Sequence, residues 1–386
     1  MTLANLDIEE LRRKVTSAYE NDRPLLEKFR DYARQLKDNI RPLRPYSVNA
    51  VSFVSTDGGD NRIAFDPALI ELVRIVDSRG NQCALDVVAS SASLDELQKR
   101  AEDGPCCVTP LHRMCADLQV NFKDLSYLLK TMGQGGKSTA ALRCYRDIVE
   151  WAVLYDMICN PQLQWGGDTI LVRDGLLRTK SFRRDVFPRL RERIKAGIEA
   201  HARRNVNLSL VAVAKQSAVL SRLAVALELE GTFHRPYPCY VKVPPEIEAD
   251  CYNYERTWLV KYDDAITNDD GELLFQNMGS LYLVKFGDQP MDPVWPVDIA
   301  DWQDRDASRI LGQLMYDAQF GFPIPDYPMC IQKAHDLAQI SPLEVGLLQD
   351  LVIEGINKDL SQQESERLLR FRYLSQNISA WRYMEG

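Results

Sequence analysis

The sequence predicts an α/β protein in which a mixed β-sheet is flanked by helices. Strand-like apolar runs follow one another between about residues 49 and 90, separated by turns that carry Gly or Pro. From residue 139 onward, patterns typical of helices and strands alternate. The run NLSLVAVAKQ at 207–216 is almost wholly apolar, which is typical of a central strand buried on both faces. Together these observations indicate one sheet with both parallel and antiparallel neighbours.

The N-terminal segment, residues 6–40, has helical periodicity. Asp22-Arg23-Pro24 predicts a break into two helices, because Pro lacks the backbone N–H and Asp is typical of a helix start. The segment AVSFVST is expected to end at Asp57-Gly58-Gly59, a sequence typical of hairpin turns, and a new strand is expected to begin at Arg62. Three consecutive antiparallel strands are the simplest interpretation of AVSFVST, RIAFD, LIELVRIVDS and QCALDVVAS.

Helical character dominates residues 93–160 and ends in the long periodic segment STAALRCYRDIVEWAVLYDMI. A strand TILVRD, a short strand LLRTK and a basic helix at 183–204 are expected next, before the apolar strand at 207–216. A helix at SAVLSRLAVALE and strands at PCYVKV, LYLVKF and WPVDIA follow. Three helices complete the prediction, at about 303–320, 329–340 and 343–357.

The composition is that of an ordinary globular protein: 386 residues, 45% hydrophobic and 26% charged. No apolar run approaches the ~18 residues of a membrane span. The N-terminus, MTLANLDIEELRRK, lacks the apolar core of a signal peptide. Nine cysteines without a CxxC pair fit a reducing compartment, and CCVTPLHRMC matches no common zinc-finger spacing. We therefore expect a cytoplasmic protein that is not bound to a membrane.

Charge is unevenly distributed along the chain. The net charge of −8 excludes a protein that binds nucleic acid through an overall basic field. Residues 183–204, however, contain eight Lys or Arg against three Asp or Glu. This helix could follow a phosphate backbone through Arg183, Arg184 and Arg189. It could equally be a solvated helix with internal ion pairs, and both interpretations stay open.

The segment MGQGGKSTAAL, residues 132–142, resembles a nucleotide-binding P-loop. That loop needs a Gly five positions before Gly136-Lys137-Ser138, because its backbone amides wrap around a phosphate. The residue at that position is Thr131, and no apolar strand precedes it. A Gly-rich loop in which Ser138 or Thr139 caps the next helix is therefore favoured over an ATP site.

Two strands far apart in the sequence are expected to end in Asp-Gly, at Asp57 and at Asp174. Side chains at the ends of neighbouring strands converge on one edge of a sheet, where open α/β sheets bind ligands. Two carboxylates at that edge could hold Mg²⁺ or Mn²⁺, since both ions favour oxygen ligands. Glu150, on the helix before TILVRD, is the best third acid, and Asp147 and Asp156 on the same helix are the alternatives.

Four segments between about residues 50 and 340 resemble, in order, the motifs of the NurA nuclease family: STDGG, ILVRDGLL, VAVAKQSAV, and Tyr-Pro followed after five residues by AHDLA. This resemblance implies a ribonuclease-H-like fold. It also implies that Asp57, Glu150 and Asp174 bind the metal and that Tyr327 and His335 complete the site. Lys215, in the third motif, would contact a phosphate. The order of a three-strand meander and then helix, strand, helix, strand is also that of ribonuclease-H-like domains.

Proteins of the NurA family cut DNA with Mn²⁺ or Mg²⁺, as dimers beside a hexameric HerA-type ATPase. The resemblance therefore implies a metal-dependent DNA nuclease, a homodimer and a HerA-type partner, in DNA end processing or in defence against foreign DNA. A non-catalytic DNA-binding protein, or a structural subunit of a motor complex, is the alternative.

Three regions are expected along the chain. Residues 1–45 would form a helical N-terminal arm, residues 46–345 a NurA-like nuclease domain, and residues 346–386 a helical tail. Within the nuclease domain, about 93–135 and about 247–273 would be a helical and a polar insertion.

Overall fold

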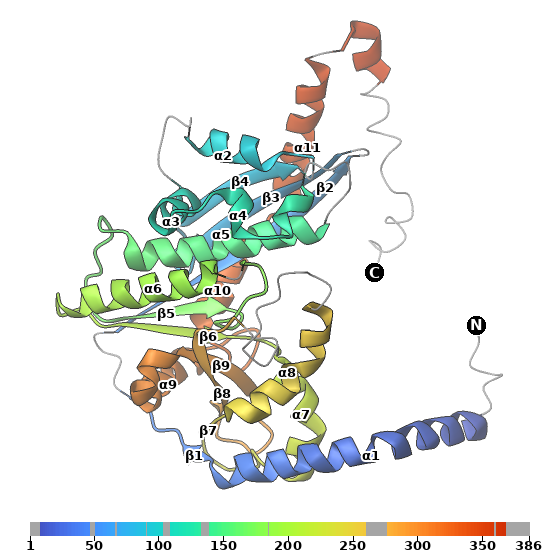
Figure 1. Cartoon of the computed structure of the whole chain (residues 1–386), viewed down its shortest axis with the longest axis vertical. Helices are drawn as coiled ribbons and strands as arrows, with labels where there is room; N and C mark the ends of the chain where they lie inside the picture. Colours follow the sequence, from blue (N-terminus) through green and yellow to red (C-terminus); the bar gives the residue numbers. More distant parts are fainter. Residues whose placement is uncertain are drawn as a thin grey trace.

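A computed structural model of the chain contains a sheet in which nine strands are described, in the order β1-β7-β8-β9-β6-β5-β2-β3-β4 (Figure 1). It describes residues 8–46, 51–65, 68–89, 91–102, 109–132, 139–183, 185–259, 276–358 and 360–367. The strands are β1 Arg41–Pro42, β2 Ser52–Phe65, β3 Ala68–Asp77, β4 Gln82–Ala89, β5 Thr169–Asp174, β6 Leu208–Val213, β7 Cys239–Lys242, β8 Gly279–Lys285 and β9 Val294–Ala300.

The strand directions confirm the predicted mixed sheet. Strands β2, β3 and β4 form an antiparallel meander, whereas β5 runs parallel to β2 and β6 runs parallel to β5. On the other side of β6, strands β9, β8, β7 and β1 are antiparallel to their neighbours. All residues of β6 are buried and β6 is the fifth strand in the order of nine described strands, so the prediction of a central strand is confirmed.

The expected end of the first strand at Asp57-Gly58-Gly59 is wrong. Strand β2 continues through these residues to Phe65 and pairs with β3 along this whole stretch. A side chain at either glycine would collide with a neighbouring element: Glu150 lies 2.4 Å from the Cβ position of Gly58, and the Ala338 carbonyl oxygen lies 2.0 Å from that of Gly59. The glycines permit close packing on both faces of the strand rather than a turn.

The expected break near Pro24 is also wrong. The structure has one helix, α1 (Ile8–Asp38), with Pro24 inside it. Its second half packs through Phe29, Ala33 and Leu36 against a cluster that includes side chains of α7 (Ala218–Leu229) and α8 (Pro245–Leu259). This packing outweighs the backbone hydrogen bond that Pro cannot donate.

The remaining helices follow the predicted pattern closely. The region between β4 and β5 contains α2 Leu94–Glu102, α3 Pro110–Leu118, α4 Phe122–Leu125, the 3-10 turn η2 Leu129–Thr131 and α5 Thr139–Cys159. The later helices are α6 Val186–Ala202, the 3-10 segment η3 Asp301–Asp306, α9 Ala307–Ala318, α10 Met329–Ala338 and α11 Pro342–Asn357. The expected short strand LLRTK is wrong, because it makes only an isolated bridge between Arg178 and Asn277.

Helices cover both faces of the sheet (Figure 1). One face packs against α9 and α10. The opposite face packs against α3, α5 and α6 around β2, β5 and β6, and against α1, α7 and α8 around β7 and β8. Successive residues of each strand therefore point to different helical layers.

Several sequence features fall outside the described residues, namely the glycines and Lys137 of the P-loop-like segment, Cys106 and Cys107, residues 260–273 of the expected polar insertion, and residues 368–386 of the tail. In the part of the chain that the structure describes, no helix combines the length and the apolar character that crossing a bilayer requires.

Candidate metal centre

The two predicted aspartates lie side by side on adjacent parallel strands. Thr56 of β2 pairs with Arg173 of β5, so the residues that follow them, Asp57 and Asp174, occupy the next position in the register. Both point to the face covered by α10, because Val172 contributes to the core on that face and side chains alternate along a strand. Strand β5 ends directly after Asp174, where Gly175 has a φ of +103° that side chains rarely adopt.

Helix α10 brings a histidine to the two carboxylates. The Nδ1 atom of His335 lies 2.7 Å from Oδ2 of Asp57. One potential ligand atom each of Asp57, Asp174 and His335 lies within 4.8 Å of the other two. The residues come from three elements that are far apart in the sequence, and the fold brings them together.

The approach of α10 depends on two residues of the adjacent strands. Gly59, which points to the same face as Asp57, leaves room for the carbonyl of Ala338 at the end of the helix. Arg74, the partner of Gly59 on β3, donates to the carbonyls of Leu337, Ala338 and Gln339. Its other terminal nitrogen pairs with Glu344 of α11 at 2.6 Å. Arg74 therefore caps the helix that carries His335 and was not predicted from the sequence.

Tyr327 and Lys215 also lie at this centre. The Tyr327 hydroxyl, which is fully buried, lies 3.3 Å from Oδ1 of Asp174 and 3.4 Å from the carbonyl of Val213. Burial and the nearby charge of Asp174 raise the pKa of Tyr327, so its hydroxyl keeps its proton and donates it. The ammonium of Lys215 lies 3.8 Å from Oδ2 of Asp174 and remains 43% exposed. It can therefore reach a ligand bound at the carboxylates.

Glu150 lies on the opposite face of the sheet from the cluster. It belongs to α5, and its Oε1 atom occupies the space where Gly58 has no side chain. Its carboxyl lies 3.5 Å from Arg173 and 3.4 Å from Arg146. Burial raises the pKa of Glu150 to about 8, against the lowering effect of Arg173 and with a further contribution from the charge of Asp57. Glu150 thus interacts electrostatically with Asp57 across strand β2. Among the described residues, the cluster of close ligand atoms consists of Asp57, Asp174 and His335 and does not include Glu150.

Asp147 and Asp156, the alternatives to Glu150, pair with other side chains and not with the metal centre. Asp147 accepts hydrogen bonds from Arg173 at 2.7 Å and from Thr179 at 2.8 Å. Asp156 forms an ion pair with Arg113. The guanidinium of Arg173 also lies over the Trp151 ring, 4.6 Å from its centroid. Arg173 therefore pairs with the carboxylates of Asp147 and Glu150 on the face of the sheet that packs against α5. The only sequence signal for Arg173 is its position directly before Asp174.

The cluster fits a divalent metal ion chemically. Burial and the negative charge of Asp57 raise the pKa of Asp174, whereas Lys215, Arg173 and the Tyr327 hydroxyl oppose this rise. A bound cation would relieve the repulsion between the two carboxylates. Carboxylates suit Mg²⁺ and Mn²⁺, and imidazole is a better ligand for transition metals, so the mixed donor set of this cluster favours Mn²⁺.

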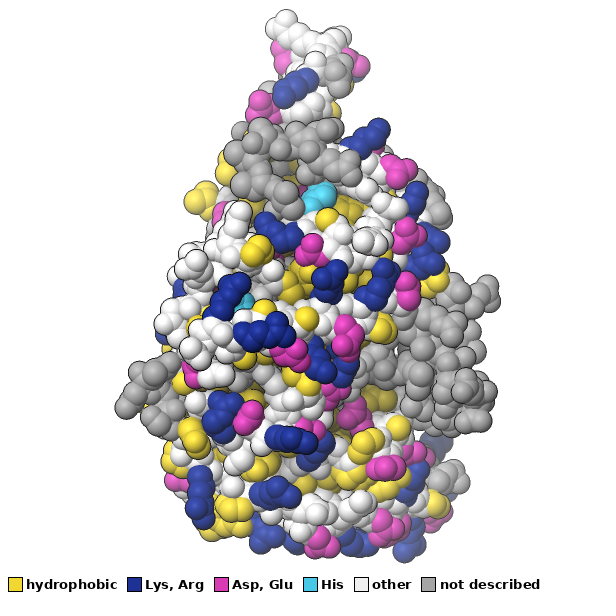
Figure 2. All heavy atoms as spheres, turned by 60° about the vertical axis from the view of Figure 1, so that its left-hand side comes forward, with side chains coloured by type: hydrophobic (Ala, Val, Ile, Leu, Met, Phe, Trp, Pro, Cys, Tyr) yellow, Lys and Arg dark blue, Asp and Glu magenta, His cyan; other side chains and the backbone are white. Residues whose placement is uncertain are grey.

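The predicted DNA-binding arginines that the structure describes have partners within the protein. Arg183 pairs with Asp124 at 3.0 Å and lies over the Tyr127 ring, while Arg189 bonds to Asp185 at 2.8 Å and to the Leu118 carbonyl at 2.6 Å. Arg184 lies outside the described residues. Figure 2 shows Lys and Arg on this side of the molecule interspersed with Asp and Glu, without a continuous basic band. The internal ion pairs match the second interpretation of this segment, the solvated helix.

Comparisons with known proteins find similarity only among solved structures. No protein-family model matches the sequence, and no curated protein sequence matches it. The NurA nuclease from Sulfolobus solfataricus is 15% identical, with 91% of this chain and 99% of that chain covered and a TM-score of 0.36. NurA with manganese is 9% identical (90% and 99% covered, TM-score 0.40), and NurA bound to dAMP and manganese is 12% identical (95% and 99% covered, TM-score 0.37). The family that the sequence motifs resemble is also the family of these structures.

Proposed function

We propose that this protein is a metal-dependent DNA nuclease that hydrolyses phosphodiester bonds with Mn²⁺ or Mg²⁺. The observation that carries the proposal is the cluster of Asp57, Asp174 and His335, whose ligand atoms lie within 4.8 Å of one another. Asp57 and Asp174 would hold the ion, with His335 beside it. A bound ion of this kind makes a water molecule more acidic and stabilises the negative charge that develops on the phosphate.

The side chains around the ion have separate tasks in this proposal. A proton on Nδ1 of His335, donated to Asp57, leaves the other ring nitrogen free to bind the ion or to take up a proton. Tyr327 holds Asp174 in place through its buried hydroxyl. Lys215 supplies a positive charge for a phosphate oxygen of the substrate, since its ammonium is partly exposed beside Asp174.

Glu150 is the third acid of the proposal. Its pKa of about 8 keeps most of its carboxyl groups protonated at neutral pH. A cation beside Asp57 would lower this pKa, because the added positive charge favours the ionised carboxylate. We therefore assign Glu150 to the metal centre as an acid that ionises when the ion binds.

DNA is the proposed substrate, and the basic segment around Arg183, Arg184 and Arg189 is a proposed secondary contact. Each phosphate contact adds about one to the slope of log affinity against log salt. A triple change of these arginines to Gln should weaken DNA binding and flatten that slope. Arg203→Gln is the matched control, since Arg203 is 76% exposed at the far end of α6. A triple variant with the wild-type slope would exclude the segment from the DNA path.

A second copy of the chain and a HerA-type ATPase are the proposed partners. Two helices expose apolar side chains in support of such contacts: Ile8, Leu11 and Val15 on the first half of α1, and Leu343 and Leu347 on α11. The described cysteines are all free thiols, in keeping with the proposed cytoplasmic setting.

The decisive experiment measures cleavage of end-labelled linear single- and double-stranded DNA with Mn²⁺, Mg²⁺ or EDTA. Asp57→Asn and Asp174→Asn, each checked for folding, should lose metal-dependent cleavage. Asp306→Asn, which changes an exposed carboxylate on a different element, should keep it. Cleavage that survives in both site variants would refute the proposed site. Failure of the wild type to cut, even with the ATPase added, would favour the non-catalytic DNA-binding or structural alternative.

A further inference from the structure

A buried hydroxyl beside the metal centre has no hydrogen-bond partner within the protein. Ser55 lies on β2, two residues before Asp57, and is 1% exposed. Its Oγ atom makes no hydrogen bond to any residue that the structure describes. Such a group costs free energy on folding, because it has given up its hydrogen bonds to water. An unpaired buried hydroxyl at this position therefore indicates a role other than stability.

The backbone of Ser55 is fully bonded, so only its side chain is unpaired. The Ser55 N–H donates to the Ser78 hydroxyl at 3.1 Å, and the Ser55 carbonyl accepts from the Ser78 N–H at 2.8 Å. These two bonds join β2 to the residue directly after β3 and fix the direction in which the Ser55 side chain leaves the strand.

The strand register shows which polar groups lie near this hydroxyl. Side chains alternate along β2, so Phe53, Ser55 and Asp57 point to the same face, which α10 covers. Ser55 pairs with Val172 of β5. The row before this pair consists of Phe53 and Ile170, which are apolar, and the row after it holds the two carboxylates of the metal centre. Along β2 and β5, the hydroxyl therefore has polar neighbours only in the direction of the metal centre.

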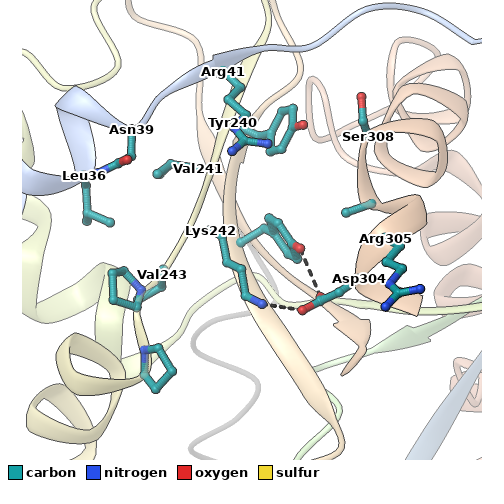
Figure 3. Close-up of a pocket in the computed structure, with 14 residues that line it drawn as sticks. Leu36, Asn39, Arg41, Tyr240, Val241, Lys242, Val243, Asp304, Arg305 and Ser308 are labelled. Carbon is teal, nitrogen blue, oxygen red and sulfur yellow. Dashed lines mark hydrogen bonds and ion pairs between the residues drawn. The ribbon is translucent and has the colours of Figure 1, made fainter. Parts of the chain in front are cut away.

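Other hydroxyls on this face of the sheet have a carboxylate as their direct partner. The Tyr327 hydroxyl lies 3.3 Å from Asp174. The Tyr282 hydroxyl donates to Asp304 at 3.0 Å, several strands away (Figure 3), and the Ser280 hydroxyl donates to the same carboxylate at 2.9 Å. Ser55 differs from these residues, because a carboxylate lies on the same face of its strand but does not accept its hydrogen bond.

The separation between Ser55 and Asp57 fits one intervening water molecule. Two residues along a strand are about 6.6 Å apart at ~3.3 Å per residue, which is too far for a direct hydrogen bond between two short side chains. A water molecule can bridge such a gap at little cost in free energy. Mg²⁺ usually keeps several of its water ligands when it binds to protein carboxylates, and a Ser hydroxyl can both donate to and accept from water.

We propose that Ser55 is a positioning residue of the metal centre, whose hydroxyl binds a water ligand of the ion that Asp57 and Asp174 hold. This inference rests on the proposed function, because it needs an ion at these carboxylates. The water ligand supplies the partner that the described residues do not provide. Residues that support metal ligands in this way typically change metal affinity about 10- to 100-fold when they are replaced.

The test measures Mn²⁺ affinity by calorimetry and the melting temperature of the full-length protein in EDTA. Ser55→Ala should weaken Mn²⁺ binding at least about tenfold. Its melting temperature in EDTA should equal or exceed that of the wild type, because the change removes a buried polar atom without leaving another one unpaired. A serine with a purely structural role would lower both quantities together.

Ser126→Ala is the matched control. Ser126 is 2% exposed, and its Oγ atom accepts from the Leu128 N–H at 3.2 Å and from the Cys144 thiol at 3.2 Å. Loss of this partnered hydroxyl leaves the Leu128 N–H without its acceptor, so the melting temperature should fall. Mn²⁺ affinity should stay that of the wild type, since Ser126 packs on the opposite side of the sheet, beside α5.

The remaining outcomes overturn the inference in distinguishable ways. Wild-type Mn²⁺ affinity in Ser55→Ala, together with weak binding in Asp57→Asn, would refute the role of Ser55 and leave the metal centre standing. Weaker Mn²⁺ binding accompanied by a lower melting temperature, or failure of Ser55→Ala to fold, would show that the hydroxyl supports packing instead. No Mn²⁺ binding by the wild type, or binding that Asp57→Asn leaves unchanged, would refute the metal centre itself and this inference with it.

Discussion

Replacement of Gly59 by Ala should move the helix that carries His335. The Cβ atom would lie 2.0 Å from the carbonyl oxygen of Ala338 and 2.8 Å from its carbonyl carbon. An ordinary contact begins near 3.4 Å, so the end of α10 would have to shift by about 1.4 Å. Backbone atoms cannot rotate away as a flexible side chain can, and β2 is fixed by pairing with both β3 and β5.

A shift of this size is large compared with the contact that it would disturb. His335 and Asp57 are 2.7 Å apart, and a hydrogen bond weakens steeply beyond ~3.2 Å. We expect Gly59→Ala to reduce the free energy of unfolding by about 1–3 kcal/mol, the usual cost of overpacking. We also expect its affinity for Mn²⁺ to fall at least about tenfold, because the imidazole no longer lies beside the carboxylates.

The assays are thermal unfolding followed by circular dichroism and Mn²⁺ titration by calorimetry, both on metal-free protein. Gly346→Ala is the matched control, since a Cβ atom at Gly346 in α11 meets nothing within 4 Å and Ala is the better helix former. Wild-type affinity for Mn²⁺ together with wild-type stability in Gly59→Ala would refute the idea that this glycine admits α10 to the strand.

Three further predictions concern the surroundings of the cluster. Glu150→Gln should change how the free energy of unfolding depends on pH. The pKa of Glu150 rises from 4.5 to about 8 on folding, so between these pH values the free energy of unfolding of the metal-free wild type falls by about 1.4 kcal/mol per pH unit relative to the variant. Parallel plots of the two free energies against pH, from denaturant unfolding, would contradict this. Tyr327→Phe should lower the free energy of unfolding by about 1 kcal/mol. It should also shift Mn²⁺ binding to higher pH, because loss of the hydroxyl removes a contact that lowers the pKa of Asp174. An unchanged dependence of Mn²⁺ affinity on pH would exclude that role of Tyr327. Arg74→Met should weaken Mn²⁺ binding by loosening the end of α10. Glu344→Gln removes the ion pair to Arg74 but keeps an oxygen that can accept from Ser341 at the start of α11, and it should bind Mn²⁺ normally. Equal effects of the two changes would show that the ion pair rather than the cap positions α10.

The sequence by itself determined the elements whose signals are local. The apolar run of β6 predicted a strand buried on both faces, and Asp174-Gly175 predicted the end of β5. In the structure Gly175 has the positive φ that glycine adopts most readily. The side chains of Asp57, Asp174 and His335 were also predicted, through the order of their motifs. Local patterns and motif order are properties of the chain, so they can be recognised before the fold is known.

Tertiary structure alone decided how those elements meet. Gly58-Gly59 suggested a turn because glycine in a sequence signals flexibility, whereas in the fold it provides space for Glu150 on one face of β2 and for α10 on the other. Arg74 became the cap of α10 only because β3 pairs with β2 beside that helix. Close approach of a distant segment leaves no periodic trace in the sequence, and the face that a side chain reaches depends on the strand register, which long-range pairing sets.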